Sequence, residues 1–90
     1  MSTQQITFDL SSISIDQLID EFAIVTFTEA MRNKLNKKRS QGRGDWWNND
    51  YCSQQTLSTM LREHVDKGDP IDVALFAMML YNRKETIIKE

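Results

Sequence analysis

The chain has 90 residues, with 13 acidic and 11 basic side chains and a formal net charge of −2. A chain of this length forms one domain with a modest core. Its single cysteine, Cys52, excludes an intrachain disulfide and a zinc site built from several thiolates, which fits a reducing compartment. The longest apolar run, Val73–Tyr81, is far shorter than the about 20 residues that cross a membrane, and no basic and apolar leader opens the sequence. We therefore expect a cytoplasmic protein with no membrane contact.

The charges are strongly separated along the chain. Residues 1–30 carry five acidic and no basic side chains, whereas residues 31–44 carry six basic and no acidic ones. Such separation creates a local positive patch although the total charge is near zero. The patch either binds a nucleic acid or another acidic partner, or it pairs with acidic residues of the same protein, within the chain or across an oligomer. Its residues are Arg32, Lys34, Lys37, Lys38, Arg39 and Arg43.

The first predicted elements are an extended arm and a helix. Ile6–Leu10 alternates apolar and polar residues, so residues 1–13 are expected to be extended. Ser14 and Gln17 have the spacing of a capping box, which predicts a helical region over residues 14–40. Its first apolar stripe has helical spacing and consists of Ile15, Leu18, Ile19, Phe22 and Ala23.

A break in this helical region is expected near residues 23–26. The run Ala23–Phe27 is rich in β-branched residues, which lose side-chain freedom in a helix. Thr26 and Glu29 also have the spacing of a second capping box. A new helix would then begin near Phe27 and place Phe27, Ala30, Met31 and Leu35 on its apolar face.

A loop and two further helices follow. Glycines and an asparagine-rich turn predict a loop over residues 41–52. Ser53 is the expected N-cap of a helix over residues 53–67, and Gly68 fits its C-terminal end. Asp69 and Pro70 are typical of the start of a helix over residues 69–84. The sequence thus predicts one all-α domain over residues 1–90, a small bundle of three to four helices with a short extended N-terminal segment.

The last predicted helix is apolar nearly all round, from Val73 to Tyr81. Such a helix lies at the centre of a fold or at a subunit interface, and a short chain offers little protein to cover every face. We therefore expect oligomerisation to complete the bundle. The adjacent tryptophans favour the same interpretation, because a buried indole contributes a large apolar area. The expected interface residues are Trp46, Trp47, Phe76, Met79 and Leu80.

Two residues with reactive side chains are interpreted as structural. His64, the only histidine, lies on the apolar stripe of its helix, where a histidine is usually packed or hydrogen-bonded. Cys52 has no second cysteine or adjacent histidine to support a nucleophilic site. We therefore predict no catalytic residue.

Four carboxylates leave a metal site open as an alternative. Glu63 and Asp66 are three residues apart on one helix, and Asp69 and Asp72 are three apart on the next. Converging helices could bring them together around Mg²⁺, which prefers carboxylate oxygens. The competing interpretation is that Asp69 caps its helix, Asp72 interacts with the helix dipole, and the other two are solvated.

Several segments resemble a known family. Phe27–Leu35, the basic turn with glycine and tryptophan, Leu61–Val65 and Asp72–Leu80 look like the phage-borne branch of the all-α nucleotide pyrophosphohydrolases (MazG-like), over residues 27–83. The resemblance implies a helical bundle of two or more chains that hydrolyses nucleoside triphosphates to monophosphate and pyrophosphate with Mg²⁺. In that family an E-E-x-x-E motif and an E-x-x-D motif on the next helix hold the metal.

The metal motifs are altered in this chain. Glu63 matches the first glutamate, but His64 and Lys67 stand in place of the other two. Asp72 matches the aspartate of the second motif, and Asp69 replaces its glutamate. A histidine and a lysine in place of two carboxylates leave little negative charge to hold Mg²⁺ together with a triphosphate. The resemblance therefore implies the scaffold more than the chemistry.

Three functions are open on this basis. We expect a non-catalytic accessory protein of phage or prophage type, without a cofactor, that self-associates and binds a host or phage macromolecule. One alternative is a reduced Mg-dependent pyrophosphohydrolase that uses the four carboxylates. The other is a nucleic-acid-binding accessory protein that uses the basic residues 32–43.

Overall fold

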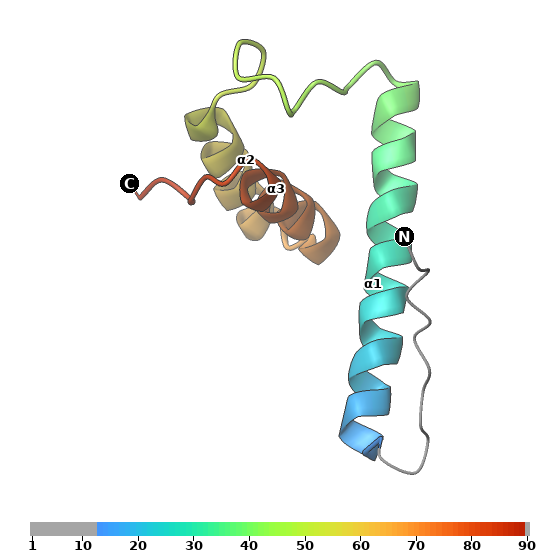
Figure 1. Ribbon diagram of the computed structural model, residues 1–90. Helices are drawn as coiled ribbons and strands as arrows, with labels where there is room; N and C mark the ends of the chain where they lie inside the picture. The colour runs from blue at the N-terminus through green and yellow to red at the C-terminus, as the bar shows by residue number, and fades with distance from the viewer. Residues whose placement is uncertain (1–12, 90) are drawn as a thin grey trace, which may run out of the picture.

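The computed structural model describes residues 13–89 and contains three helices (Figure 1). α1 spans Ile15–Ser40, α2 spans Gln54–Lys67 and α3 spans Pro70–Asn82. α2 packs against α3, and α1 packs against α3 alone. All regular structure in the described residues is helical, which confirms the all-α prediction. The expected extended arm lies outside the described residues except for its last position.

Local signals explain where the helices begin and end. The Ser14 hydroxyl accepts a hydrogen bond from the Gln17 amide, and the Gln17 side chain accepts one from the Ser14 amide, which completes the capping box of α1. The Ser53 hydroxyl accepts the Thr56 amide at the start of α2, and the Asp69 carboxylate accepts the Ile71 and Asp72 amides at the start of α3. Gly68 ends α2 with a φ of 79°, a left-handed conformation that favours glycine. α2 and α3 lie within two residues of their predicted ranges.

α1 is continuous through residues 23–26, so the expected break is wrong. Thr26 lies inside the helix rather than at its N-terminus. A β-branched residue lowers helix stability by only about 0.5 kcal/mol relative to alanine, and the flanking turns outweigh this cost because helix propagation is cooperative. What changes at this point of α1 is the face that is apolar, and the backbone continues unchanged.

The core lies between α2 and α3. Its buried apolar side chains are Leu57, Leu61, Leu75, Phe76, Met79 and Leu80. Met31 and Leu35 of α1 and Trp46 of the loop pack against this cluster. α3 is therefore the central helix of the chain. Phe76, Met79 and Leu80 were expected at a subunit interface, but they are only 2–4% exposed, because the chain itself covers the apolar helix.

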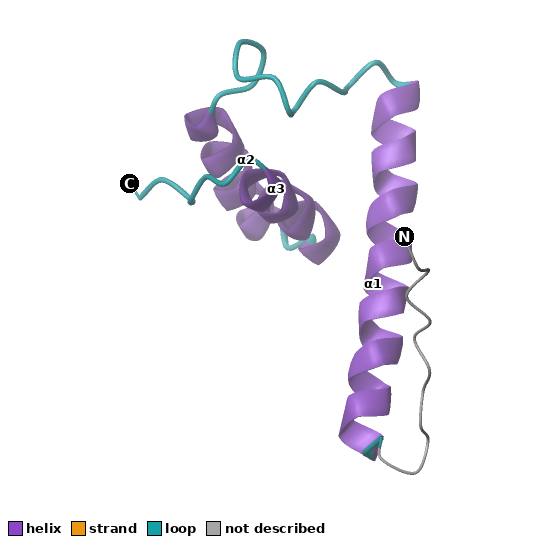
Figure 2. Cartoon of the chain, viewed as in Figure 1, coloured by secondary structure: helices purple, strands orange, loops and turns teal. Residues whose placement is uncertain are grey.

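The N-terminal half of α1 extends beyond the α2–α3 pair (Figures 1 and 2). Every residue from Ile15 to Phe27 is exposed. The radius of gyration is 16.5 Å, whereas a compact chain of this length has about 12 Å. One half of α1 thus docks on the core, and the other half leaves its side chains open to solvent.

Candidate functional site

Charged side chains of α1 and α3 meet where α1 passes the N-terminus of α3, beside His64 of α2. The Lys34 Nζ lies 2.9 Å from Asp69 Oδ2 and 3.4 Å from Asp72 Oδ2, and the Lys38 Nζ lies 3.7 Å from Asp72 Oδ1. Lys34 and Lys38 are one helical turn apart, so both project from the same face of α1. Asp69 caps α3 and Asp72 lies in its first turn. The two lysines therefore fasten α1 to the start of α3.

The closest of these pairs is ionic at neutral pH. The hydrogen bond from Lys34 lowers the pKa of Asp69 from its ordinary 3.8 to about 2, and the backbone amides at the start of α3 contribute to the same shift. The same hydrogen bond raises the pKa of Lys34 above its ordinary value. Each partner thus holds the other in its charged form.

His64 of α2 joins this cluster as a packed side chain. Its Nδ1 lies 2.7 Å from the carbonyl oxygen of Met60, so Nδ1 donates, and its Nε2 lies 3.7 Å from Asp72 Oδ2. Its ring lies against Phe76, with 4.9 Å between the ring centroids. The histidine is hydrogen-bonded and half-buried, as its place on the apolar stripe predicts.

The four candidate metal ligands do not converge. Asp69 and Asp72 lie together on α3, but Glu63 and Asp66 are exposed on α2. Asp69 Oδ2 and both oxygens of Asp72 face ammonium groups, which repel a cation. Within residues 13–89 no group of three or more potential metal ligands occurs. The residues present here do not fit a magnesium ion.

The basic segment divides into two sets. Lys34 and Lys38 face α3 and are engaged with its carboxylates, so they are not available to a nucleic acid. Arg32, Lys37 and Arg39 of α1 remain exposed, as does Arg43 of the loop. The acidic partner of the segment within the described chain is thus the start of α3.

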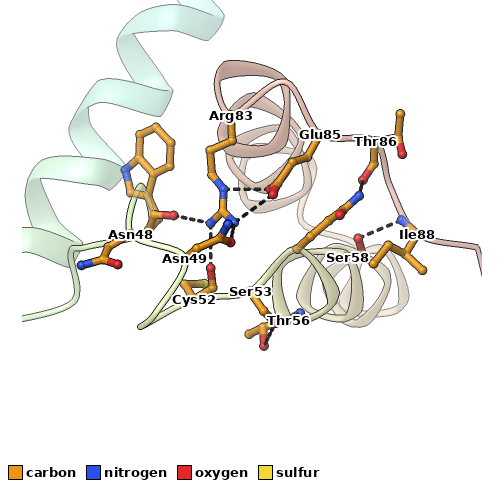
Figure 3. Close-up of polar contacts among 12 residues, drawn as sticks. Asn48, Asn49, Cys52, Ser53, Thr56, Ser58, Arg83, Glu85, Thr86 and Ile88 are labelled. Carbon is orange, nitrogen blue, oxygen red and sulfur yellow. Dashed lines mark hydrogen bonds and ion pairs between the residues drawn. The ribbon is translucent and has the colours of Figure 1, made fainter.

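A clamp that the sequence analysis missed fixes the loop between α1 and α2 (Figure 3). Arg83 Nη1 donates to the carbonyl oxygens of Trp46, at 2.6 Å, and Cys52, at 2.7 Å, while Nη2 donates to the Asn49 side chain. Arg83 Nε lies 2.8 Å from Glu85 Oε1, and the arginine side chain is only 8% exposed. The signal in the sequence was an arginine directly after an apolar helix with a glutamate two residues later.

The two tryptophans have different environments. Trp46 is half-buried and packs against the core, whereas Trp47 is 64% exposed. Cys52 is a free cysteine that also packs against the core, which agrees with a structural role. Of the five expected interface residues, Trp47 alone is largely accessible.

The projecting half of α1 carries an exposed apolar face. Ile15, Ile19, Phe22 and Val25 are each at least 60% exposed, and Leu18 is 41% exposed. Phe22 precedes Lys38 by sixteen positions, which places the two about 160° apart around the helix. The exposed face therefore points away from α3, on nearly the opposite side of α1 from the lysines that dock it.

Comparisons with known proteins identify no relative. No family model, no curated protein and no solved structure matches this chain. None of the helices in the described part is long and apolar enough to cross a membrane.

Proposed function

We propose that this protein is a non-catalytic helical interaction protein of phage or prophage type, acting in the cytoplasm as an assembly of two or more copies that binds a host or phage macromolecule. The observation that carries the proposal is the exposed apolar face of α1, from Ile15 to Val25. Large contiguous apolar patches on monomeric proteins are uncommon and mark interaction sites. The resemblance to a family of multi-chain helical bundles is consistent with it.

Charge complementarity favours a second copy of α1, in antiparallel orientation, as the occupant of this face. The N-terminal half of α1 is acidic and the C-terminal half basic. A parallel pair would place acid beside acid, whereas an antiparallel pair places each acidic half beside a basic one. The face is free for such a partner along α1, because α3 lies on the other side.

One register satisfies the charges of both halves. Glu21 and Arg32 are eleven positions apart, about 20° around the helix, so they lie on the same flank of α1. Equal flanks face each other in an antiparallel pair, so a pair centred between these positions joins each Glu21 to Arg32 of the second copy. Both are exposed, with no ion pair to each other or to other residues in the described chain. The same register brings Asp16 near Lys37 on the other flank.

Replacing Phe22 tests self-association. We expect the wild-type chain to elute as a dimer in size-exclusion chromatography with light scattering at tens of micromolar, and Phe22→Asp to be a monomer, since it places a charge in the centre of the apolar contact. Tyr81→Asp is the matched control, because Tyr81 is 81% exposed on α3 and away from this face. A wild-type monomer under these conditions removes the proposal.

A charge exchange tests the antiparallel register. Glu21→Arg sets two arginines against each other at both ends of the pair, so the dimer dissociation constant should rise by about tenfold. Glu21→Arg combined with Arg32→Glu restores opposite charges and should restore the wild-type constant. A double variant whose dissociation constant stays as high as that of Glu21→Arg contradicts this register. The Phe22→Asp experiment does not depend on the register and still tests self-association.

Nucleic acid is a second candidate partner, supported by the four basic side chains that remain exposed. Phosphate contacts release counterions, so such binding weakens steeply as salt increases. Fluorescence anisotropy with a short duplex DNA over a salt series would detect it. The absence of DNA binding at low salt contradicts this second function and leaves the self-association proposal unaffected.

A further inference from the structure

A cavity opens between the C-terminal end of α1, the loop that follows it, and the α2–α3 pair. Its volume is about 300 Å³. Its floor is formed by core side chains, including Leu57, Phe76 and Met79, and both Trp46 and Trp47 line it. A cavity of this kind, apolar and aromatic with a few polar groups, is typical of small-molecule sites. Its size lies at the lower end of the range for such sites and suits a ligand of about two fused rings.

The rim of the cavity is positive. Lys38, Arg39 and Arg43 line it together with one acidic side chain, Asp45, so three positive charges face one negative charge. Lys38 shares its charge with Asp72 of α3. Arg39 donates to the Asn36 side chain and Arg43 to that of Gln41, and both acceptors are neutral amides. Within residues 13–89 neither guanidinium has a carboxylate partner, which leaves both charges to attract an anion.

The walls of the cavity are fixed before any ligand enters. Arg83 binds the carbonyl oxygens of Trp46 and Cys52, and both of these residues line the cavity. Trp46 and Cys52 also pack against the core. A preformed site binds with little loss of conformational entropy.

We propose that this cavity binds a small organic anion with a planar apolar body, the rings lying against the tryptophans and the core and the anionic group meeting Arg39 and Arg43. Guanidinium groups favour planar or tetrahedral oxyanions, and indole rings favour flat apolar partners. The site is independent of the proposed assembly, because its lining includes none of the exposed residues Ile15 to Val25 of α1.

A pair of probes separates the two parts of this proposal. 8-Anilinonaphthalene-1-sulfonate is anionic, and N-phenyl-1-naphthylamine has the same rings without the sulfonate. We expect one sulfonate probe per chain in a fluorescence titration, bound about tenfold more tightly than the neutral probe. Arg39→Gln with Arg43→Gln should remove that preference and leave the neutral probe unchanged. Lys67→Gln with Lys89→Gln is the control, since it removes the same charge from exposed positions outside the lining.

A second variant ties binding to the cavity itself. Trp47→Ala removes an exposed wall, which the fold tolerates, and should weaken both probes by about tenfold. If the probes bound instead to the exposed apolar face of α1, their affinity would be the same in the arginine variant, the tryptophan variant and the wild type. Equal binding of the two probes, or unchanged binding of the sulfonate in either the arginine or the tryptophan variant, overturns the proposal.

Discussion

Asp69 has two roles that act at one carboxylate. One oxygen accepts the amides of Ile71 and Asp72 and caps α3, and the other accepts from Lys34 of α1. The start of one helix and its attachment to another therefore depend on the same charge.

Asp69→Asn separates these roles, because asparagine also caps helices well. The pKa of Asp69 is about 2 in the folded chain and 3.8 ordinarily, so the unfolded chain takes up more protons between these values. The contribution of Asp69 to stability is thus complete above pH 4 and is lost as the pH falls towards 2. Urea unfolding across this range should show a shallower loss for Asp69→Asn than for wild type, and a lower stability of the variant at pH 7.

Asp66→Asn serves as the control for that experiment, because Asp66 is exposed on α2 outside the ion-pair cluster. Equal pH dependence in wild type and Asp69→Asn would contradict the assignment of the acid-sensitive step to the Lys34 pair.

Asp72 contributes to stability in the ion-pair cluster. Its side chain is 11% exposed and lies near two lysines and His64. Removing one partner from a largely buried ion pair leaves the other charges unpaired, so Asp72→Asn should lower the free energy of unfolding by about 3 kcal/mol. Glu63→Gln, at an exposed position, should change it by less than about 0.5 kcal/mol. Chemical denaturation measures both, and equal values would contradict a structural role for Asp72.

The residues of this cluster could be predicted only in part. The caps at Ser14, Ser53 and Asp69 depend on neighbours within three residues, so spacing in the sequence predicts them. The pairing of Asp69 with Lys34 spans 35 positions and depends on how α1 docks, which no local pattern specifies. For the same reason the sequence left the partner of the basic segment open between an external anion and acidic residues of the same protein, and it did not indicate that two of its lysines face α3.

At the scale of the helices, α1 shows that apolar periodicity predicts which residues share a face but does not predict where a helix ends. The two predicted stripes are real, but they lie on different sides of one continuous helix. The first contains Phe22 and is exposed, and the second contains Met31 and Leu35 and packs on the core. The β-branched residues and the capping-box spacing at the change of apolar face predicted a break, but in the structure these residues lie inside one helix.

Thr26→Ala distinguishes a continuous helix from a helix start. Inside a helix, alanine replaces a β-branched residue and should leave the helix content by circular dichroism equal or higher. At an N-cap the same change would cost about 1 kcal/mol. Ser53→Ala, at the N-cap of α2, should show that loss and is the comparison. A Thr26→Ala variant with helix content reduced as in Ser53→Ala would indicate a helix start at that position.

At the scale of the whole molecule, the apolar character of α3 correctly predicted a central or interface helix. The sequence analysis favoured a subunit interface, whereas the chain itself covers this helix. α2 and the apolar residues of α1 cover this helix, together with Trp46 of the loop over residues 41–52, which Arg83 holds in place. The cavity beside this loop was not predictable either, since its walls come from all three helices and the connection between them.

The whole protein should not respond to magnesium. A metal that binds only the folded state raises its melting temperature, whereas Asp69 Oδ2 and both oxygens of Asp72 already face lysines. We expect the same melting temperature with Mg²⁺ and with a chelator, and no pyrophosphate release from nucleoside triphosphates. If Mg²⁺ raised the melting temperature and Asp72→Asn abolished that rise, the result would instead support the pyrophosphohydrolase alternative.

Under the proposed assembly, the projecting half of α1 links folding to the amount of protein present. The segment Ile15–Phe27 has 13 residues with every side chain exposed, and isolated helices of that length are marginal in water. If a second copy covers this segment, helix formation at residues 15–27 and association become one equilibrium. Dilution below the dissociation constant would then unwind the first turns of α1 while the α2–α3 pair stays folded, so helix content would vary with protein concentration.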